Sequence, residues 1–405
     1  MTAVDTTRRA VLALLGTALF GKELKLPEMV DWQAVLREMQ LHAVHGLAAD
    51  LIVTLEGVDA EVRSQWVKRT GQSVQRFYHV LHEQQEAVAL LEQAGFRPAV
   101  LKGASAAQYY PEPAYRAMGD SDLLLPGDAA DRAAELLAAH GYQRIPAKQA
   151  APRHVALTKN GVKFELHRSF CTMADGQLAD AFDQLLIGGL KALRRQELCG
   201  YAFPALPQML EGLVLLEHAN HHMLSGIGLR QMLDWLVFVD RAVDDESWSA
   251  VFRPKLQEFG LERYAMVIAR MGQLYFGLRT QGRTWCAGAD EDSCAQLLAF
   301  VMDCGNFGVK YGRRRAASKV MTDFGGVRET FRSLQARGCA NFAGVIARYP
   351  FLQPFAWLMR LVRLAALGLR RGLGMSDLRG AFAQSRRRRR LFRMTGVVRT
   401  RENEE

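Results

Sequence analysis

The sequence has few cysteines and lacks several short motifs of cofactor and nucleophile chemistry. Its 405 residues contain six cysteines, none of them in a Cys-x-x-Cys pair. Neither a disulfide framework nor a zinc ribbon is therefore expected, and reduced thiols in a cytoplasm are the simplest interpretation. The Gly-x-x-x-x-Gly-Lys-Ser/Thr loop, the dinucleotide fingerprint and the Gly-x-Ser-x-Gly elbow are also missing. P-loop kinases, dinucleotide-dependent dehydrogenases and α/β-hydrolases are thus poor alternatives.

Long apolar runs are missing as well. No stretch reaches the roughly 20 apolar residues that a membrane-spanning helix needs. The nearest is Ala10–Gly21, twelve residues that follow Arg8-Arg9. An export signal is one interpretation, but charged residues resume at once with Lys22 and Glu23, so we favour a partly buried first helix. We expect a cytoplasmic protein.

Net positive charge is small except at one end of the chain. The segment Arg360–Glu405 holds thirteen Arg and no Lys against one Asp and three Glu, a balance of +9 out of the chain's +10. The remaining residues are nearly neutral, so we expect no specific nucleic-acid partner. The five arginines Arg386–Arg390 are typical of a solvated arm, and the sequence does not indicate the role of this arm.

Four regions follow from the changes in pattern along the chain. Apolar residues at helical spacing predict helices before about residue 95 and again after about 175. Between them, short apolar runs alternate with helical stretches. We therefore expect an N-terminal helical region at 1–95, an α/β core at 96–175, a C-terminal helical domain at 176–347 and a basic amphipathic tail at 348–405.

Residues 96–175 predict a small sheet. Apolar runs indicate strands at Pro98–Leu101 and Ser121–Leu125, and a helix is expected at Ala129–His140. Asn160-Gly161 lies between two further strand candidates, and this dipeptide is the strongest two-residue hairpin signal. The order of strands and helices indicates an α/β unit.

Three acidic residues of this unit are candidates for metal binding. Asp120 and Asp122 share one face of the second strand because side chains alternate along a strand. On a later strand Glu165 shares a face with His167. Carboxylates that repel one another are relieved by a divalent cation, and Mg²⁺ prefers oxygen ligands. Three carboxylates can hold two such ions, while His167 is expected to orient a neighbour or contact substrate.

A glycine turn after the first strand is a candidate phosphate site. Lys102-Gly103-Ala104-Ser105 precedes a short helix, and such a turn presents backbone N–H groups to phosphates. Lys102, Ser105 and Arg116 could add charge or hydroxyl donors.

Together these motifs resemble the polymerase-β-like nucleotidyltransferase superfamily, and within it a bacterial family of largely uncharacterised nucleotidyltransferases. The resemblance rests on Leu101-Lys-Gly-Ala-Ser-Ala-Ala, Arg116, Gly119-Asp-Ser-Asp-Leu-Leu and Glu165-Leu-His167. The family's helical region often carries a His-x-x-x-His pair followed by Arg and Asp, and the matching residues are His218, His222, Arg230 and Asp234. It implies a small mixed sheet flanked by N- and C-terminal helical regions, an α+β or α/β fold.

The resemblance also implies a function. A Mg²⁺-dependent enzyme, with two ions in its site, would move a nucleoside monophosphate from a nucleoside triphosphate to an acceptor. Asp120, Asp122 and Glu165 would be catalytic and metal-binding, and the substrate-binding residues would be Lys102, Gly103, Ser105, Arg116, His167, His218 and His222. Protein, sugar, lipid-linked intermediate and peptide all stay open as acceptors, and base preference and oligomeric state are not encoded in any recognisable pattern.

Two alternatives belong to other functional classes. Ala104 stands where the superfamily usually has Gly or Ser, which suits a catalytically silent nucleotide-binding or adaptor protein. The mixture of leucines, aromatic residues and arginines in Phe351–Leu373 is typical either of a helix that docks on its own protein or of a membrane-surface helix. The second interpretation makes the chain a peripheral protein of an envelope-polymer pathway, held at the inner membrane through residues 351–393.

Overall fold

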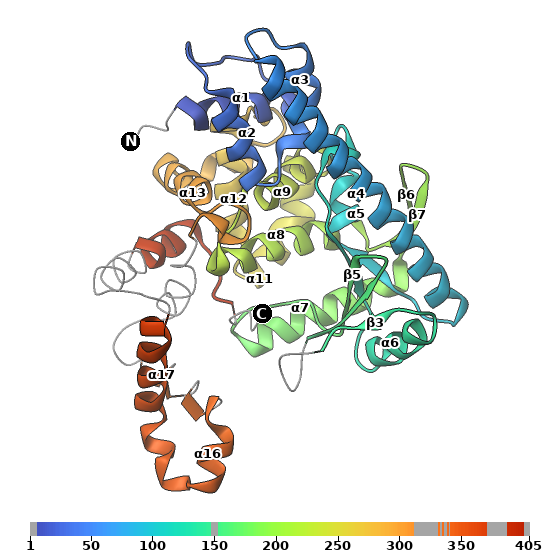
Figure 1. Cartoon of the computed structure of the whole chain (residues 1–405), viewed down its shortest axis with the longest axis vertical. Helices are drawn as coiled ribbons and strands as arrows, with labels where there is room; N and C mark the ends of the chain where they lie inside the picture. Colours follow the sequence, from blue (N-terminus) through green and yellow to red (C-terminus); the bar gives the residue numbers. More distant parts are fainter. Residues whose placement is uncertain are drawn as a thin grey trace. The chain divides into compact units, whose positions relative to one another are not determined.

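The computed structural model of the chain (Figure 1) describes residues 6–146, 153–311, 331–332, 334–335, 338–339, 341–370 and 387–400. Part of the tail expected at 348–405, including Arg386, lies outside these residues. The chain divides into two compact units. The first is Met1–Phe307 together with Thr395–Glu405, and the second is Gly308–Met394.

The first unit begins with helices, as the sequence predicts. They are α1 (Thr6–Phe20), α2 (Trp32–Leu41), the 3₁₀ turn η1 (His45–Ala48), α3 (Ala49–Thr54) and α4 (Ala60–Gln93). Asp31 caps α2, since its carboxylate accepts the Ala34 N–H at 2.8 Å. In α1 the apolar residues Ala10, Val11 and Leu14 are fully buried, in agreement with a buried helix.

A mixed, seven-stranded sheet follows, which confirms the expected fold class. Its elements and their connections are β1 (Ala99–Leu101), α5 (Gly103–Ala107), η2 (Pro113–Tyr115), β2 (Asp120–Leu124), α6 (Ala129–Ala139), β3 (Gln143–Arg144), β4 (His154–Lys159), β5 (Val162–His167), α7 (Gly176–Gly189), η3 (Leu190–Ala192), β6 (Arg194–Leu198) and β7 (Tyr201–Ala205). The strand order is β3-β4-β5-β2-β1-β7-β6. Strand β2 pairs parallel with β5 and antiparallel with β1, so these three strands form the centre.

The hairpin β6–β7 differs from expectation, because residues 194–205 fall in the region expected to be helical. Its turn is Cys199-Gly200, both at positive φ, of 52° and 84°. Pro204 lies inside β7, where a proline argues against a strand because it has no N–H to donate. A turn without Asn-Gly and a strand with a proline explain why the pattern did not reveal the hairpin.

One face of the sheet is packed against helices. Figure 1 shows α4 running along the sheet with α6 beside it. Phe77, Leu81 and Val88 of α4 belong to one buried cluster with Leu123 of β2 and Phe164 of β5. The odd-numbered residues of β2 and the even-numbered residues of β5 therefore face the core, which leaves Asp120, Asp122, Glu165 and His167 on the opposite face.

Helices complete the first unit. They are α8 (Gln208–Ser225), α9 (Leu229–Ala242), α10 (Asp245–Ser247), the π-helical turn η4 (Trp248–Phe252), α11 (Arg253–Glu258), α12 (Glu262–Met271), the π-helical turn η5 (Gly272–Phe276), η6 (Thr284–Gly288), α13 (Glu291–Cys304) and, at the boundary with the second unit, η7 (Asn306–Tyr311). The chain returns to this unit near its end, where the Val398 N–H donates to Asn220 at 2.8 Å.

The second unit contains the helices α16 (Ala343–Arg348), η8 (Pro350–Phe355) and α17 (Ala356–Arg370). Apolar side chains there are exposed, among them Phe351, Phe355 and Val362. Among the described residues of the chain, no helix has the length and apolarity to cross a bilayer.

Candidate functional site

The register of the central strands brings the predicted carboxylates together. Asp122 of β2 lies directly opposite Glu165 of β5, and Asp120 lies opposite Lys163. Neighbouring strands are about 4.8 Å apart, so paired side chains on one face are in contact range. Asp120 is two residues from Asp122 and on the same face. Asp120, Asp122 and Glu165 therefore share one sheet face, which we call the acidic face, and their role as metal ligands stays a prediction.

Lys102 stands beside these carboxylates with a strained backbone. Its φ and ψ are 49° and −134°, a conformation that costs energy for a residue with a side chain. Its Nζ lies 2.8 Å from Oδ1 of Asp122, and its ammonium lies over the ring of Phe170. The turn thus places the Lys102 ammonium against the acidic face and not in solvent.

Two histidines adjoin the carboxylates. Nε2 of His167 lies 2.7 Å from Oδ1 of Asp122 and 3.5 Å from Oε2 of Glu165. His154 of β4 contributes a second imidazole, because ligand atoms of His154, Glu165 and His167 all lie within 4.8 Å of one another. Among the described residues these three form the group whose donor atoms are close enough for a shared metal ion.

Sequence reasoning missed His154, although a signal was present. A two-residue turn at Asn160-Gly161 fixes the register of the hairpin, so that Lys159 pairs with Val162. Counting outward from this pair places His154 opposite His167, as the structure has it.

The charges of the site shift its pKa values in opposite directions. Burial raises the pKa of Asp120, and the charge of Asp122 adds to this effect. Burial alone would raise the pKa of Asp122 too, but the Lys102 ammonium and the His167 hydrogen bond lower it. The pKa of Lys102 is raised, since the carboxylates outweigh the cost of burial. Asp122 is therefore a firmly ionised partner of Lys102, whereas at Asp120 burial and the charge of Asp122 outweigh the attraction of Lys102.

The pKa of Glu165 is lowered. Burial and Asp122 favour its neutral form, but the charges of His167, Lys102 and His154 together prevail. Lys163 adds an ion pair to the same carboxylate. Glu165 is therefore ionised at neutral pH and capable of accepting a proton or ligating a cation.

The glycine turn lies next to Asp120. A Cβ on Gly103 would lie 3.2 Å from Sδ of Met118 and 3.8 Å from the Asp120 carbonyl oxygen, and φ of Gly103 is positive. Helical bonding in α5 starts with the Ala106 N–H donating to the Lys102 carbonyl at 2.9 Å. The N–H groups of residues 103–105 thus precede the helical pattern and have no helical acceptor.

Two other predicted phosphate contacts are engaged with the protein itself. Ser105 is buried and donates from Oγ to Glu211 at 2.6 Å. Arg116 is buried too, and it donates from Nε and Nη2 to Asp234 at 2.8 and 2.7 Å. Contacts of Ser105 and Arg116 with phosphate stay predictions.

The paired histidines of α8 lie together and near the same site. Nε2 of His218 is 2.9 Å from Nε2 of His222. Burial, with the charges of His222 and Lys102, lowers the pKa of His218 well below its ordinary value. The interaction with Lys102 shows that α8 approaches the acidic face, and His218 is a neutral group there. A substrate contact by either histidine stays a prediction.

This fold and this acidic face define a class of protein. A mixed sheet with converging carboxylates on its central strands, beside a strained glycine turn, is the arrangement expected of a nucleotidyltransferase. Residues 28–277 match the model of a family described as uncharacterised nucleotidyltransferase, and the chain belongs to this family. The match covers more than half of the chain and includes the whole sheet. No protein of curated function matches the chain.

Proposed function

We propose that the chain transfers a nucleoside monophosphate from a nucleoside triphosphate to an acceptor, with Mg²⁺ as cofactor. The supporting observation is the pairing of Asp122 with Glu165 across β2 and β5, with Asp120 on the same face. Two Mg²⁺ ions held there would neutralise charge on the reacting phosphate. Protein, sugar, lipid-linked intermediate and peptide are the acceptor classes considered.

The donor set fits a hard cation. The carboxylate of Asp120 has no hydrogen bond or ion pair among the described residues, and burial together with the charge of Asp122 raises its pKa. Asp122 and Glu165 supply further oxygen atoms, which Mg²⁺ prefers. The Lys102 ammonium also lies at this face, on Asp122.

Protein groups around the carboxylates would position the substrates. The N–H groups of residues 103–105 would donate to the triphosphate, and Lys102 would add positive charge. Ionised Glu165 would accept the proton of an acceptor hydroxyl, with His167 holding the neighbouring Asp122 in place. His218 and His222 would line the acceptor side. Rate acceleration would come mainly from positioning and charge neutralisation.

Labelling of candidate acceptors from a radiolabelled nucleoside triphosphate tests this proposal. Transfer should require Mg²⁺ and should be lost in the double variant Asp120→Asn, Asp122→Asn. Asp128→Asn is the matched control, since Asp128 lies on the same unit with its side chain 84% exposed. Transfer that survives in the double variant would show that these residues are not the metal ligands.

A catalytically silent nucleotide-binding protein is the second candidate. It is favoured by the engagement of Ser105 with Glu211 and of Arg116 with Asp234, which leaves fewer groups for the triphosphate. Ala104 is fully buried in the core cluster, so it adds no polar side chain. Calorimetry separates the candidates, because tight nucleotide binding without any transferred product supports the silent protein.

Peripheral contact with a membrane surface is a separate proposal for the second unit. Its support is the exposure of Phe351, Phe355, Leu358 and Val362 on η8 and α17. Liposome co-sedimentation tests it. Sedimentation that is unchanged by deletion of residues 351–393 would dispose of the idea.

A further inference from the structure

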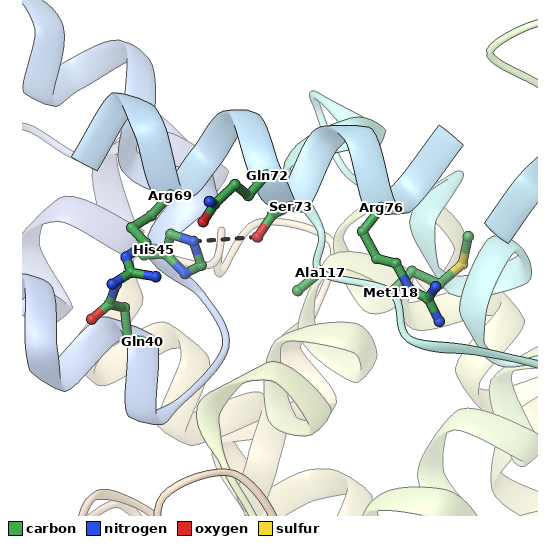
Figure 2. A pocket seen from close by; sticks show the side chains of 8 residues that line it. All are labelled: Gln40, His45, Arg69, Gln72, Ser73, Arg76, Ala117 and Met118. Atoms are coloured by element: carbon green, nitrogen blue, oxygen red, sulfur yellow. Dashed lines mark hydrogen bonds between the residues drawn. The ribbon is translucent and has the colours of Figure 1, made fainter. Parts of the chain in front are cut away.

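A polar pocket lies beside the connection that leads into β2. It has a volume of about 440 Å³ and is lined by Gln40, His45, Arg69, Gln72, Ser73, Arg76, Ala117 and Met118. The four residues from α4 follow the helical spacing that places them on one face. Figure 2 shows Arg69, His45 and Gln40 toward one end of the pocket and Arg76 and Met118 toward the other.

The lining carries positive charge without an acidic partner. None of its eight residues is Asp or Glu. Within the part of the chain that the structure describes, the guanidinium of Arg69 has neither a hydrogen bond nor an ion pair. Arg76 donates from Nη2 to the carbonyl oxygen of Gly119 at 2.6 Å, which anchors it while its charge stays uncompensated.

The remaining polar groups can donate or accept hydrogen bonds without adding charge. Nε2 of His45 lies 3.3 Å from Oγ of Ser73. Burial, together with the positive charge of Arg69, lowers the pKa of His45, so its imidazole is neutral at neutral pH. Apart from this imidazole the lining has no aromatic ring, which gives no platform for stacking a nucleotide base.

The pocket adjoins residues 117–119, the connection that leads directly to Asp120. Met118 lines the pocket and also limits the space at Gly103. Gly119 accepts the Arg76 bond and is followed directly by Asp120. From the other side, Arg230 donates to the carbonyl oxygen of Ala117 at 2.9 Å. A molecule in the pocket would therefore contact the connection that carries Asp120, without occupying the glycine turn.

We infer that this pocket binds the acceptor through an anionic group, a phosphate or a carboxylate, held by Arg69 and Arg76. The inference rests on the proposed transfer function. Arginine matches both groups because its planar guanidinium donates two parallel hydrogen bonds to either. The substrate class is therefore a negatively charged acceptor.

The test is calorimetric titration of the full chain with two probes, inorganic phosphate and sodium acetate. Saturable phosphate binding is expected. Arg69→Gln should weaken it by about tenfold, as loss of one charged hydrogen-bond donor does. Lys68→Gln is the matched control, because it removes a positive charge from the next position of α4 without touching the pocket lining. This control should change affinity by less than about twofold.

The acetate titration distinguishes the two anion sources. Binding of phosphate alone supports a phosphorylated acceptor, and binding of both probes supports carboxylates as well. Absence of saturable binding of either probe, or equal affinities in wild type and Arg69→Gln, would overturn the inference. Displacement of the Arg69-dependent phosphate by a non-hydrolysable nucleoside triphosphate would also overturn it, since the pocket would then hold the nucleotide.

Failure of the proposed function has a different signature. The variant Asp120→Asn, Asp122→Asn should keep the Arg69-dependent phosphate binding, because neither carboxylate lines the pocket. If wild type binds phosphate in this way but transfers no nucleotide, the proposed transferase function is refuted and the pocket is an anion-binding site only.

Discussion

Arg116 and Asp234 form a buried, two-pronged ion pair that joins the connection before β2 to helix α9. The guanidinium donates to both carboxylate oxygens, and the Tyr110 hydroxyl donates to Oδ1 of Asp234 at 2.8 Å. Both charged side chains are less than 5% exposed. The pair holds in place the chain that precedes Asp120, and so contributes to the position of the acidic face.

Breaking this pair is expected to destabilise the protein strongly. Arg116→Met leaves the Asp234 carboxylate buried without its counter-charge, and loss of one member of such a pair costs about 3–5 kcal/mol. Chemical denaturation measures the free energy of unfolding. Arg195→Met is the control, since Arg195 pairs with Glu92 at the surface and should cost no more than about 1 kcal/mol. Equal effects of the two substitutions would contradict the structural role of Arg116.

Local patterns were sufficient to predict the centre of the sheet. Asn160-Gly161 adopts positive φ at both residues, and the resulting hairpin places Glu165 and His167 on one face. The alternation in residues 120–125 likewise separated the acidic from the apolar side chains. These features depend on neighbours in sequence, and therefore a single sequence reveals them.

Long-range partners could not be predicted in this way. Arg116 and Asp234 are 118 residues apart, and Ser105 and Glu211 are 106 apart. Which cation meets which carboxylate depends on how α8 and α9 pack on the sheet, and no local spacing encodes it. For this reason the sequence predicted phosphate contacts for Ser105 and Arg116 and did not reveal that these residues bind Glu211 and Asp234. The pocket along α4 could not be predicted for the same reason, since its lining comes from three separate segments of the chain.

Lys102 is expected to serve both charge balance and catalysis. Lys102→Met should reduce turnover by about 10²–10³-fold, the usual effect of removing one donor that stabilises transition-state charge. Lys102→Gly removes the same charge but also relieves the backbone at φ 49°. Thermal unfolding should therefore find the glycine variant more stable than the methionine variant, by about 1 kcal/mol. Equal stabilities would show that the turn is not strained.

His154 is expected to govern the response to softer metals. Imidazole ligands suit Zn²⁺, whereas Mg²⁺ prefers oxygen. Because His154, Glu165 and His167 converge, Zn²⁺ should inhibit Mg²⁺-dependent transfer, and His154→Ala should weaken this inhibition by about tenfold while Mg²⁺ activation is kept. Zn²⁺ titrations of transfer activity measure both effects, and His140→Ala at the end of α6 serves as control, because His140 is exposed and bonds to Leu136 of its own helix. Unchanged inhibition in His154→Ala would exclude this group as a metal site.

Asp120→Asn is expected to stabilise the metal-free protein while abolishing transfer. Burial and Asp122 raise the folded-state pKa of Asp120, so its ionised form costs folding free energy at neutral pH. This cost disappears as the pH falls through that raised pKa. At pH 7 the variant should therefore melt about 2–4 °C higher than wild type, the shift that about 1 kcal/mol produces in large domains. The difference should shrink on acidification.

Added Mg²⁺ supplies the second measurement on the same pair of proteins. A ligand that binds only the folded state raises the protein's melting temperature, and at a given concentration a tighter ligand raises it more. Wild type carries the Asp120 carboxylate and should gain more from Mg²⁺ than the variant, whose amide is a weaker ligand. Asp128→Asn should behave as wild type in both experiments, because its side chain is exposed at the start of α6. An Asp120→Asn protein that melts no higher than wild type at pH 7, yet gains as much from Mg²⁺, would contradict the account of Asp120 as an unpartnered metal ligand.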